Sequence, residues 1–100
     1  MIYIKYFDIN IMSNISREKK DKLKEEILRI IYENYPGFLY TYRVAESLIR
    51  DDEFVLSLLK ELKNNELLTC IEETTGNNIK RKWGLKKEVY EKYKELTLSV

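Results

Sequence analysis

Residues 51–85 read DDEFVLSLLKELKNNELLTCIEETTGNNIKRKWGL, and this stretch decides the fold. Its first half carries apolar residues at three- and four-residue intervals, which predicts a helix over residues 53–64 with one buried face. The residues on that face are Val55, Leu58, Leu59 and Leu62. Asp51 or Asp52 is suited to cap the start of this helix, because a short carboxylate side chain accepts a hydrogen bond from a free backbone N–H.

The second half of the stretch predicts a β-hairpin. LLTCIEE at residues 67–73 predicts one strand, and IKRKWGL at residues 79–85 predicts the strand that returns beside it. Between them, TTGNN predicts a turn, since Gly76 and Asn77 tolerate a positive φ. Strand alternation separates the returning strand into two faces. One face carries Ile79, Arg81, Trp83 and Leu85, and the other carries Lys80 and Lys82.

Two further helices are predicted upstream. Ser16 is a good cap for a helix over residues 17–34, which Tyr35-Pro36-Gly37 ends. After a short extended piece at residues 38–40, Thr41 is expected to cap a helix over residues 42–49. The inward-facing residues are expected to be Leu23, Ile27, Ile30 and Ile31 in the first helix and Val44, Ala45, Leu48 and Ile49 in the second.

The two ends of the chain add a strand and a helix. Within residues 1–12, MIYIKYFDINIM, three apolar residues at 7, 9 and 11 alternate with Asp8 and Asn10. This pattern predicts either an edge strand of the local sheet or a strand that pairs with a second copy. The helix predicted over residues 86–97 carries an apolar stripe that packs either on the domain or against a partner copy. The candidate dimer residues are Ile2, Ile4, Val89, Tyr90, Tyr93 and Leu96.

The predicted element order, with two helices, a tight turn, a third helix and a hairpin, resembles the winged helix-turn-helix superfamily over residues 16–85. LLKELKNNELL at residues 58–68 looks like the family's exit from the recognition helix, with Glu66 or the pair Asn64 and Asn65 in place of the usual glycine. The hairpin at residues 71–85 looks like the wing. Added terminal elements are common in small archaeal, viral and plasmid-borne regulators of this superfamily.

The resemblance implies an α+β, mostly helical fold in a single domain spanning residues 1–100. It also implies a dimeric transcriptional regulator that binds double-stranded DNA, with the third helix in the major groove and the wing on the minor groove or phosphates. The groove-facing candidates are Asp52, Glu53, Leu56, Ser57, Lys60 and Lys63. The wing candidates are Asn77, Asn78, Lys80, Arg81 and Lys82, and Lys86 is a further candidate for holding phosphate.

The formal net charge of +1 conceals an uneven distribution along the chain. Residues 76–87 hold five basic residues and no acid, a net of +5, whereas residues 38–75 hold four basic and eight acidic residues, a net of −4. Phosphate contacts supply most non-specific affinity for DNA, so this distribution favours the wing. The acidic start of the third helix, Asp51-Asp52-Glu53, departs from the family's pattern, although ordinary capping and helix-dipole chemistry also explains it.

Other interpretations stay open. An acidic third helix with an exposed Leu56 also suits a winged helix that binds another protein instead of DNA, and the wing lysines also suit a solvated edge. The basic cluster at residues 17–24 is expected to be a solvated helix face, in which Glu18 and Asp21 pair with lysines. Trp83 is expected in the core and Cys70 as an inert buried thiol. Packing is the expected use of the remaining aromatic cluster, Tyr32, Tyr35, Phe38, Tyr40 and Tyr42.

The inventory of side chains restricts the chemistry. The chain has no histidine and a single cysteine, so it offers neither an intrachain disulfide nor a cysteine-based zinc site. We therefore expect a non-enzymatic protein without cofactor, metal or small-molecule substrate. Residues 1–12 lack the features of a targeting signal and are too short to span a bilayer, which predicts a cytoplasmic protein with no membrane partner.

Overall fold

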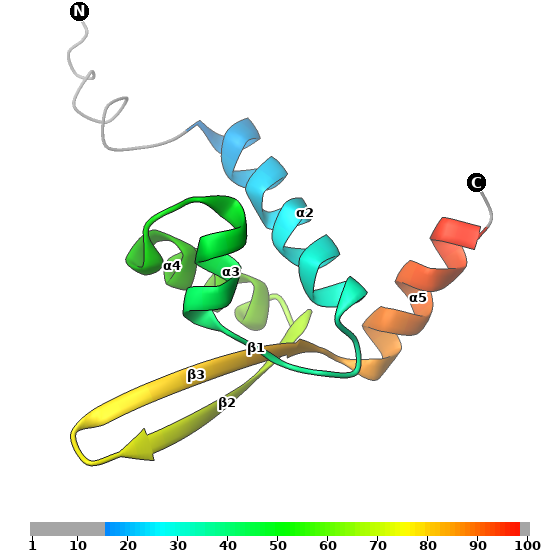
Figure 1. The fold of residues 1–100 in the computed structure, drawn as a ribbon. Coiled ribbons are helices and arrows are strands. Elements are labelled where there is room, and N and C mark those ends of the chain that lie inside the picture. Colours follow the sequence, from blue (N-terminus) through cyan, green and yellow to red (C-terminus); the bar gives the residue numbers. More distant parts are fainter. Residues whose placement is uncertain (1–15, 99–100) are drawn as a thin grey trace, which may run out of the picture.

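The computed structural model describes residues 16–98, and its elements follow the predicted order (Figure 1). They are α2 (Arg17–Glu33), β1 (Leu39–Tyr40), α3 (Thr41–Leu48), α4 (Asp52–Asn64), β2 (Leu68–Thr75), β3 (Asn78–Leu85) and α5 (Lys87–Leu98). The three strands form an antiparallel sheet in the order β1-β3-β2. This arrangement confirms the winged helix-turn-helix fold. The strand predicted over residues 1–12 lies outside the described residues.

One apolar core holds α2, α3 and α4 against the root of the hairpin. The four residues predicted on the buried face of α4 are all at most 2% exposed. Trp83 of β3 is 1% exposed, which confirms its predicted place in the core. The remaining buried members are Ile27 and Ile31 of α2, Val44 and Ala45 of α3, and Leu68 and Leu85 of the sheet. Ile30, also expected to face inward, is only half-buried.

The residues that begin and end α4 are among those that the sequence analysis named. The Asp51 side chain accepts a hydrogen bond from the backbone N–H of Phe54 at 3.1 Å, which confirms the predicted cap. After the helix, Glu66 takes a left-handed conformation with φ of 65°, and the backbone N–H of Leu67 donates to the carbonyl of Leu62 at 3.0 Å. Glu66 therefore stands where a glycine is usual, whereas Asn65 keeps a negative φ.

The predicted cap of α3 is wrong. The helix begins at Thr41, and its N-cap Tyr40 makes no side-chain capping bond. The Thr41 hydroxyl instead donates to the backbone carbonyl of Arg81 at 3.3 Å and accepts from Nε1 of Trp83 at 2.9 Å. The buried indole N–H needs an acceptor, and this need takes precedence over capping.

The prediction that Ile49 faces the core is also wrong. Ile49 follows the last residue of α3 as its C-cap, with φ of 54° and ψ of 53°, and its side chain is 89% exposed. Its backbone N–H donates to the carbonyl of Glu46 at 3.1 Å, and that of Arg50 donates to the carbonyl of Ala45 at 3.0 Å. These bonds end the helix with a left-handed residue, a conformation that is unfavourable for a β-branched side chain.

The β2–β3 hairpin extends beyond the helices as the wing (Figure 1). Cys70 pairs with Trp83 on the face toward the core, and Ile71 pairs with Lys82 on the outer face, to which Tyr40 of β1 also belongs. At the root of the outer face, Gly84 lies under the ring of Phe38. A Cβ at position 84 would come within 2.8 Å of that ring, so the strand has no room there for a side chain.

The aromatic residues at the end of α2 fix α5 to the domain. The rings of Tyr35 and Tyr90 stack with centroids 3.9 Å apart and planes at 9°, and Tyr32 contacts the rings of both Tyr90 and Tyr93. Packing is therefore the use that these tyrosines have, as the sequence predicts. No residue of α5 is fully buried, so the helix is held mainly through this aromatic contact and the half-buried Val89.

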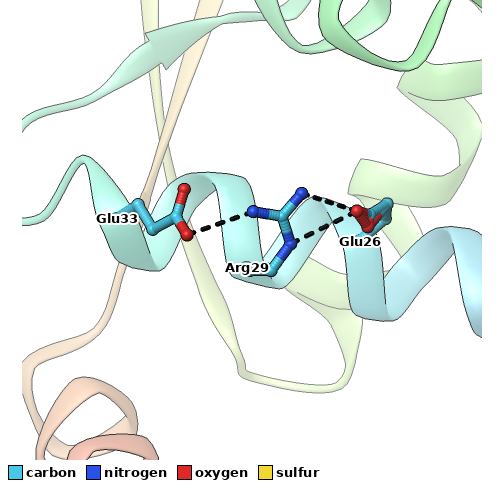
Figure 2. A network of polar contacts seen from close by, with 3 residues as sticks. All are labelled: Glu26, Arg29 and Glu33. Carbon is cyan, nitrogen blue, oxygen red and sulfur yellow. Dashed lines mark hydrogen bonds and ion pairs between the residues drawn. The ribbon is translucent and has the colours of Figure 1, made fainter.

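The exposed side of α2 carries a small ion-pair network (Figure 2). Arg29 donates to Glu26 at 2.6 and 3.2 Å and to Glu33 at 3.1 Å. These hydrogen bonds hold the pKa of Glu26 below its ordinary value and raise the pKa of Arg29. Such pairs within one helix support it locally.

The basic start of α2 does not pair within itself as predicted. Lys24 reaches across to α4, where its Nζ lies 2.6 Å from Oε1 of Glu61. This contact holds the pKa of Glu61 below its ordinary value and fastens α2 to α4. The prediction considered only neighbours within α2 and missed this contact between helices.

Replacing Thr41 by valine should destabilise the fold by about 1–2 kcal/mol, because the buried N–H of Trp83 loses its acceptor while the side-chain shape is kept. Thr41→Ser keeps the hydroxyl and is expected to lose much less stability. Urea denaturation of the two variants measures the difference. Equal loss in both would show that the hydroxyl contributes nothing.

Replacing Ile49 by glycine should stabilise the fold by about 0.5–1 kcal/mol, because it removes the left-handed strain and no buried contact. The matched control is Glu46→Gly, in the helical part of α3, which should destabilise by about 1 kcal/mol. Denaturation midpoints of both variants test the opposite signs, and a loss of stability in Ile49→Gly would contradict the assignment of strain.

Candidate nucleic-acid interface

The start of α3, the start of α4 and the middle of the wing meet around an open pocket of about 230 Å³. It is lined by Tyr40 of β1, Thr41 and Tyr42 of α3, Asp52, Glu53 and Leu56 of α4, and Ile79, Lys80 and Arg81 of β3. The pocket brings predicted groove-facing and wing residues together, although they are far apart in the sequence. Opposite charges face each other across it, because carboxylates lie on the α4 side and cations on the wing side.

The groove-facing candidates of α4 differ in their environments. Lys60 and Lys63 are exposed, as predicted. Ser57 is exposed, but its hydroxyl donates to the carbonyl of Phe54 at 2.6 Å, within its own helix. Leu56 was expected to be exposed and is instead half-buried, packed against the core. The expectation failed because Leu56 faces the wing, which only the tertiary structure brings beside it.

The wing candidates lie on the hairpin as predicted. Asn77 is in the turn, and Asn78 opens β3 opposite Thr75, with both side chains exposed. Lys80 is exposed as well, and its Nζ lies 5.8 Å from the centroid of the Tyr40 ring. These three residues leave the end of the wing polar and basic.

Three of the five basic residues in residues 76–87 have acidic partners. Arg81 pairs with Glu72 at 3.0 Å, Lys82 with Glu73 at 2.9 Å, and Lys86 with Glu66 at 3.6 Å. The first two partners lie on β2, directly beside the basic strand. The separation into a basic and an acidic stretch therefore holds along the sequence but not in space, since the hairpin pairs the two stretches with each other.

Glu73 is the centre of the densest polar contact on the wing. Its Oε1 accepts a hydrogen bond from the Tyr40 hydroxyl at 2.7 Å, and its Oε2 lies 2.9 Å from Nζ of Lys82. The hydrogen bond from Tyr40, together with Lys82, holds the pKa of Glu73 below its ordinary value. The same contacts raise the pKa of Tyr40 and of Lys82.

A second basic group lies near the root of the wing. Lys63 of α4 and Lys86 line the same shallow hollow, together with Cys70 of β2. Cys70 is only half-buried, whereas the sequence predicts a buried thiol, and this partial burial raises the pKa of the thiol. The predicted DNA-binding cations are thus divided between the middle of the wing and its root.

The structure adds functional candidates that sequence reasoning missed. Tyr40 was assigned to packing, and Glu72 and Glu73 were counted only as acidic charge. Nothing local in the sequence marks them, because Tyr40 meets Glu73 only through the pairing of three strands. The signal that could have found them is the alternation of β2, which places Glu73 and Lys80 side by side on one face.

The candidate dimer residues of α5 contact their own domain. The Tyr90 ring stacks on Tyr32 and Tyr35, the Tyr93 ring contacts Tyr32 at a tilt, and Val89 is half-buried against the core. Leu96 is 63% exposed. Ile2 and Ile4 lie outside the described residues.

Across residues 16–98, metal-ligating side chains do not gather in groups of three or more. None of the helices in this part of the chain combines the length and apolar character needed to cross a membrane.

Solved structures with the same fold include the zinc-responsive MarR family member ZitR from Lactococcus lactis, which superposes with a TM-score of 0.55 at 26% identity over 77% of this chain and 55% of that chain. A mutant MepR from a multidrug resistant S. aureus clinical isolate superposes with a TM-score of 0.59 at 16% identity, over 89% of this chain and 70% of that one. A Methanosarcina mazei protein described as a possible transcriptional regulator gives 0.59 at 13% identity, over 91% and 77%.

These likenesses confirm the winged helix-turn-helix fold across the described part of the chain. This chain spans about half the length of the first ZitR chains that it matches, 49% and 55%. No protein-family model and no curated protein matches the sequence.

Replacing Tyr40 by phenylalanine should raise the pKa of Glu73, because the hydrogen bond that lowers it most is lost. A lowered pKa means that the contact adds stability above the unfolded-state pKa and loses it as the pH falls through the folded-state pKa. In Tyr40→Phe the free energy of unfolding should therefore fall less steeply as the pH is lowered through the titration of Glu73. Carboxyl-carbon NMR titration measures the pKa directly. Tyr42→Phe serves as the control and should leave the Glu73 titration unchanged, whereas an equal shift in both variants would contradict the assignment.

Proposed function

We propose that this chain is a DNA-binding transcriptional regulator without enzymatic activity. The observation that carries the proposal is the meeting of α3, α4 and a basic, polar wing around one junction of a winged helix-turn-helix fold. The proposal is supported by the solved relatives, which include a MarR family member and a protein described as a possible transcriptional regulator. Duplex DNA is the proposed partner.

The wing is the main contact in this proposal. Lys80, Arg81, Lys82 and Lys86 hold backbone phosphates, and Asn77 and Asn78 at the exposed turn enter the minor groove. Three of these cations pair with carboxylates on the protein surface. Surface ion pairs contribute only about 0–1 kcal/mol each, so a phosphate can replace the carboxylate at small cost.

In this proposal α4 makes fewer contacts with DNA than a recognition helix with a basic start would make. Asp52 and Glu53 at its start repel phosphates, so base reading there depends on neighbouring cations that hold the DNA. Lys60 and Lys63, about two and three turns further along, are the exposed cations of this helix. Ser57 is the third groove-facing residue of α4, and it contacts DNA once its hydroxyl no longer donates to the backbone carbonyl of Phe54.

We also propose that the protein acts as a homodimer through α5. The first half of that helix is fastened to its own domain by Tyr90 and Tyr93. Its second half exposes large apolar side chains, with Leu96 at 63% and Leu98 at 75%. A contact made there between two copies would set the distance between two wings on DNA, with Ile2 and Ile4 as the further candidates.

The test of DNA binding is a fluorescence-anisotropy titration against duplex DNA at a series of salt concentrations. Lys80→Ala with Lys82→Ala should weaken binding by about tenfold or more at low salt and lower the slope of log K against log salt by about 2. The matched control is Lys92→Ala with Lys94→Ala, which removes the same charge from exposed positions of α5 and should change binding much less.

Absence of binding at low salt, or equal effects of the two double variants, would contradict the proposal. Binding of a protein partner that persists at about 0.5 M salt, without DNA binding, would support the alternative of a winged-helix interaction module. Sedimentation of the same samples without DNA measures the oligomeric state, for which a dimer is expected.

A further inference from the structure

We propose that Tyr40, Lys80 and Lys82 form a binding site for a single DNA backbone phosphate, and that the Glu73 carboxylate occupies this site when DNA is absent. The inference rests on the proposed function and assigns roles to Tyr40 and Glu73 that the sequence did not suggest. Its basis is the arrangement of two donors on one carboxylate, with the cation of Lys80 nearby, on the outer face of the wing.

The contacts already resemble those of a bound oxyanion. The Tyr40 hydroxyl donates to Oε1 of Glu73 at 2.7 Å, while Nζ of Lys82 lies 2.9 Å from Oε2. Each carboxylate oxygen therefore has its own donor. The Nζ atoms of Lys80 and Lys82 lie 5.8 and 5.9 Å from the centroid of the Tyr40 ring, so both cations lie beside the phenol.

Strand pairing builds this arrangement. Tyr40 of β1 is opposite Lys82 of β3, and Glu73 of β2 is opposite Lys80. Because directly opposed residues share a face, all four side chains lie on the outer face of the sheet. Each of the three strands contributes at least one group, so the site depends on the sheet rather than on a flexible loop.

A phosphate suits these donors at least as well as the carboxylate. Its two non-bridging oxygens can take the places of the two carboxylate oxygens beside Tyr40 and Lys82, and each has a further lone pair that can accept from a third donor. Lys80 can supply that donor, since it takes part in none of the ion pairs found between residues 16 and 98. The side chain of Glu73 is 40% exposed and that of Lys82 is 30% exposed, so water and a ligand can both reach the pair.

The neighbouring pair on the wing lacks these features and supplies a matched control. Arg81 and Glu72 lie on the opposite face of the hairpin, with Arg81 Nε donating to Glu72 Oε2 at 3.0 Å. Glu72 and Glu73 are adjacent residues of the same strand, so neutralising either one changes the net charge equally. Only the loss of the Glu73 charge weakens the hold of a carboxylate on Tyr40 and Lys82, so that a phosphate can displace the side chain from the proposed site.

The experiment compares Glu73→Gln with Glu72→Gln in duplex-DNA titrations at fixed low salt. Glu73→Gln should bind about three- to tenfold more tightly than Glu72→Gln. Both variants gain the same long-range attraction, but Glu72→Gln releases the single cation Arg81, whereas Glu73→Gln releases Lys82 and loosens Tyr40 beside Lys80. Adding Tyr40→Phe to Glu73→Gln should remove part of that gain. Equal affinities of the two glutamine variants would overturn the site and leave only general electrostatics.

A second measurement separates this inference from the proposed function. Inorganic phosphate, titrated against Glu73→Gln and followed by NMR, should shift the side-chain signals of Tyr40, Lys80 and Lys82 saturably, with a weaker effect in Glu72→Gln. Missing or equal shifts would overturn the phosphate site even if duplex DNA binds. Failure of the wild-type chain to bind duplex DNA would overturn the proposed function, and the phosphate titration would still decide whether the site exists.

Discussion

The hydrogen bond from the buried indole N–H of Trp83 to the hydroxyl of Thr41 fixes the three-stranded sheet relative to α3 and the helices packed on it. Trp83 is 1% exposed and pairs with Leu39 on one side and Cys70 on the other, so it lies in the middle of the three-stranded sheet. Thr41 is the first residue of α3, and it also donates to the backbone of β3. The orientation of the wing relative to the helix-turn-helix is therefore set at this point.

The charge distribution on the wing follows from the pairing of β2 with β3. A net charge taken along the sequence separates a basic hairpin strand from an acidic preceding segment, but the antiparallel pairing places them side by side. Glu72 and Glu73 each neutralise a cation on β3. Positive and negative charges therefore nearly cancel on the surface that DNA would contact. The affinity for DNA depends on how easily phosphates displace Glu72 and Glu73 from their ion pairs with β3.

Local signals in the sequence were sufficient for α4 and the hairpin. Helical periodicity, the Asp51 cap and the turn at Gly76 each depend on residues close together in the chain, and the structure agrees with them. At the exit of α4 the sequence predicts Glu66 or the pair Asn64 and Asn65 in place of the usual glycine, with the left-handed conformation expected at an asparagine, and the structure places that conformation at Glu66.

The errors arose where distant segments compete for the same group. Thr41 has a capping side chain by type, but the buried Trp83 takes its hydroxyl. Ile49 fits the apolar pattern of α3, but the tight turn to α4 directs it into solvent. Tyr40 and Glu73 could not be identified together, because their contact requires the order of all three strands, which periodicity does not reveal.

The contact between Gly84 and Phe38 has an evolutionary consequence. The ring occupies the space that a Cβ at position 84 would need, so neither residue is free to change alone. A homologue with a side chain at position 84 must carry a smaller residue at position 38 or move the segment that holds it. The two positions should therefore covary among relatives, and the pair marks the root of the wing in an alignment even where the charges of the wing have diverged.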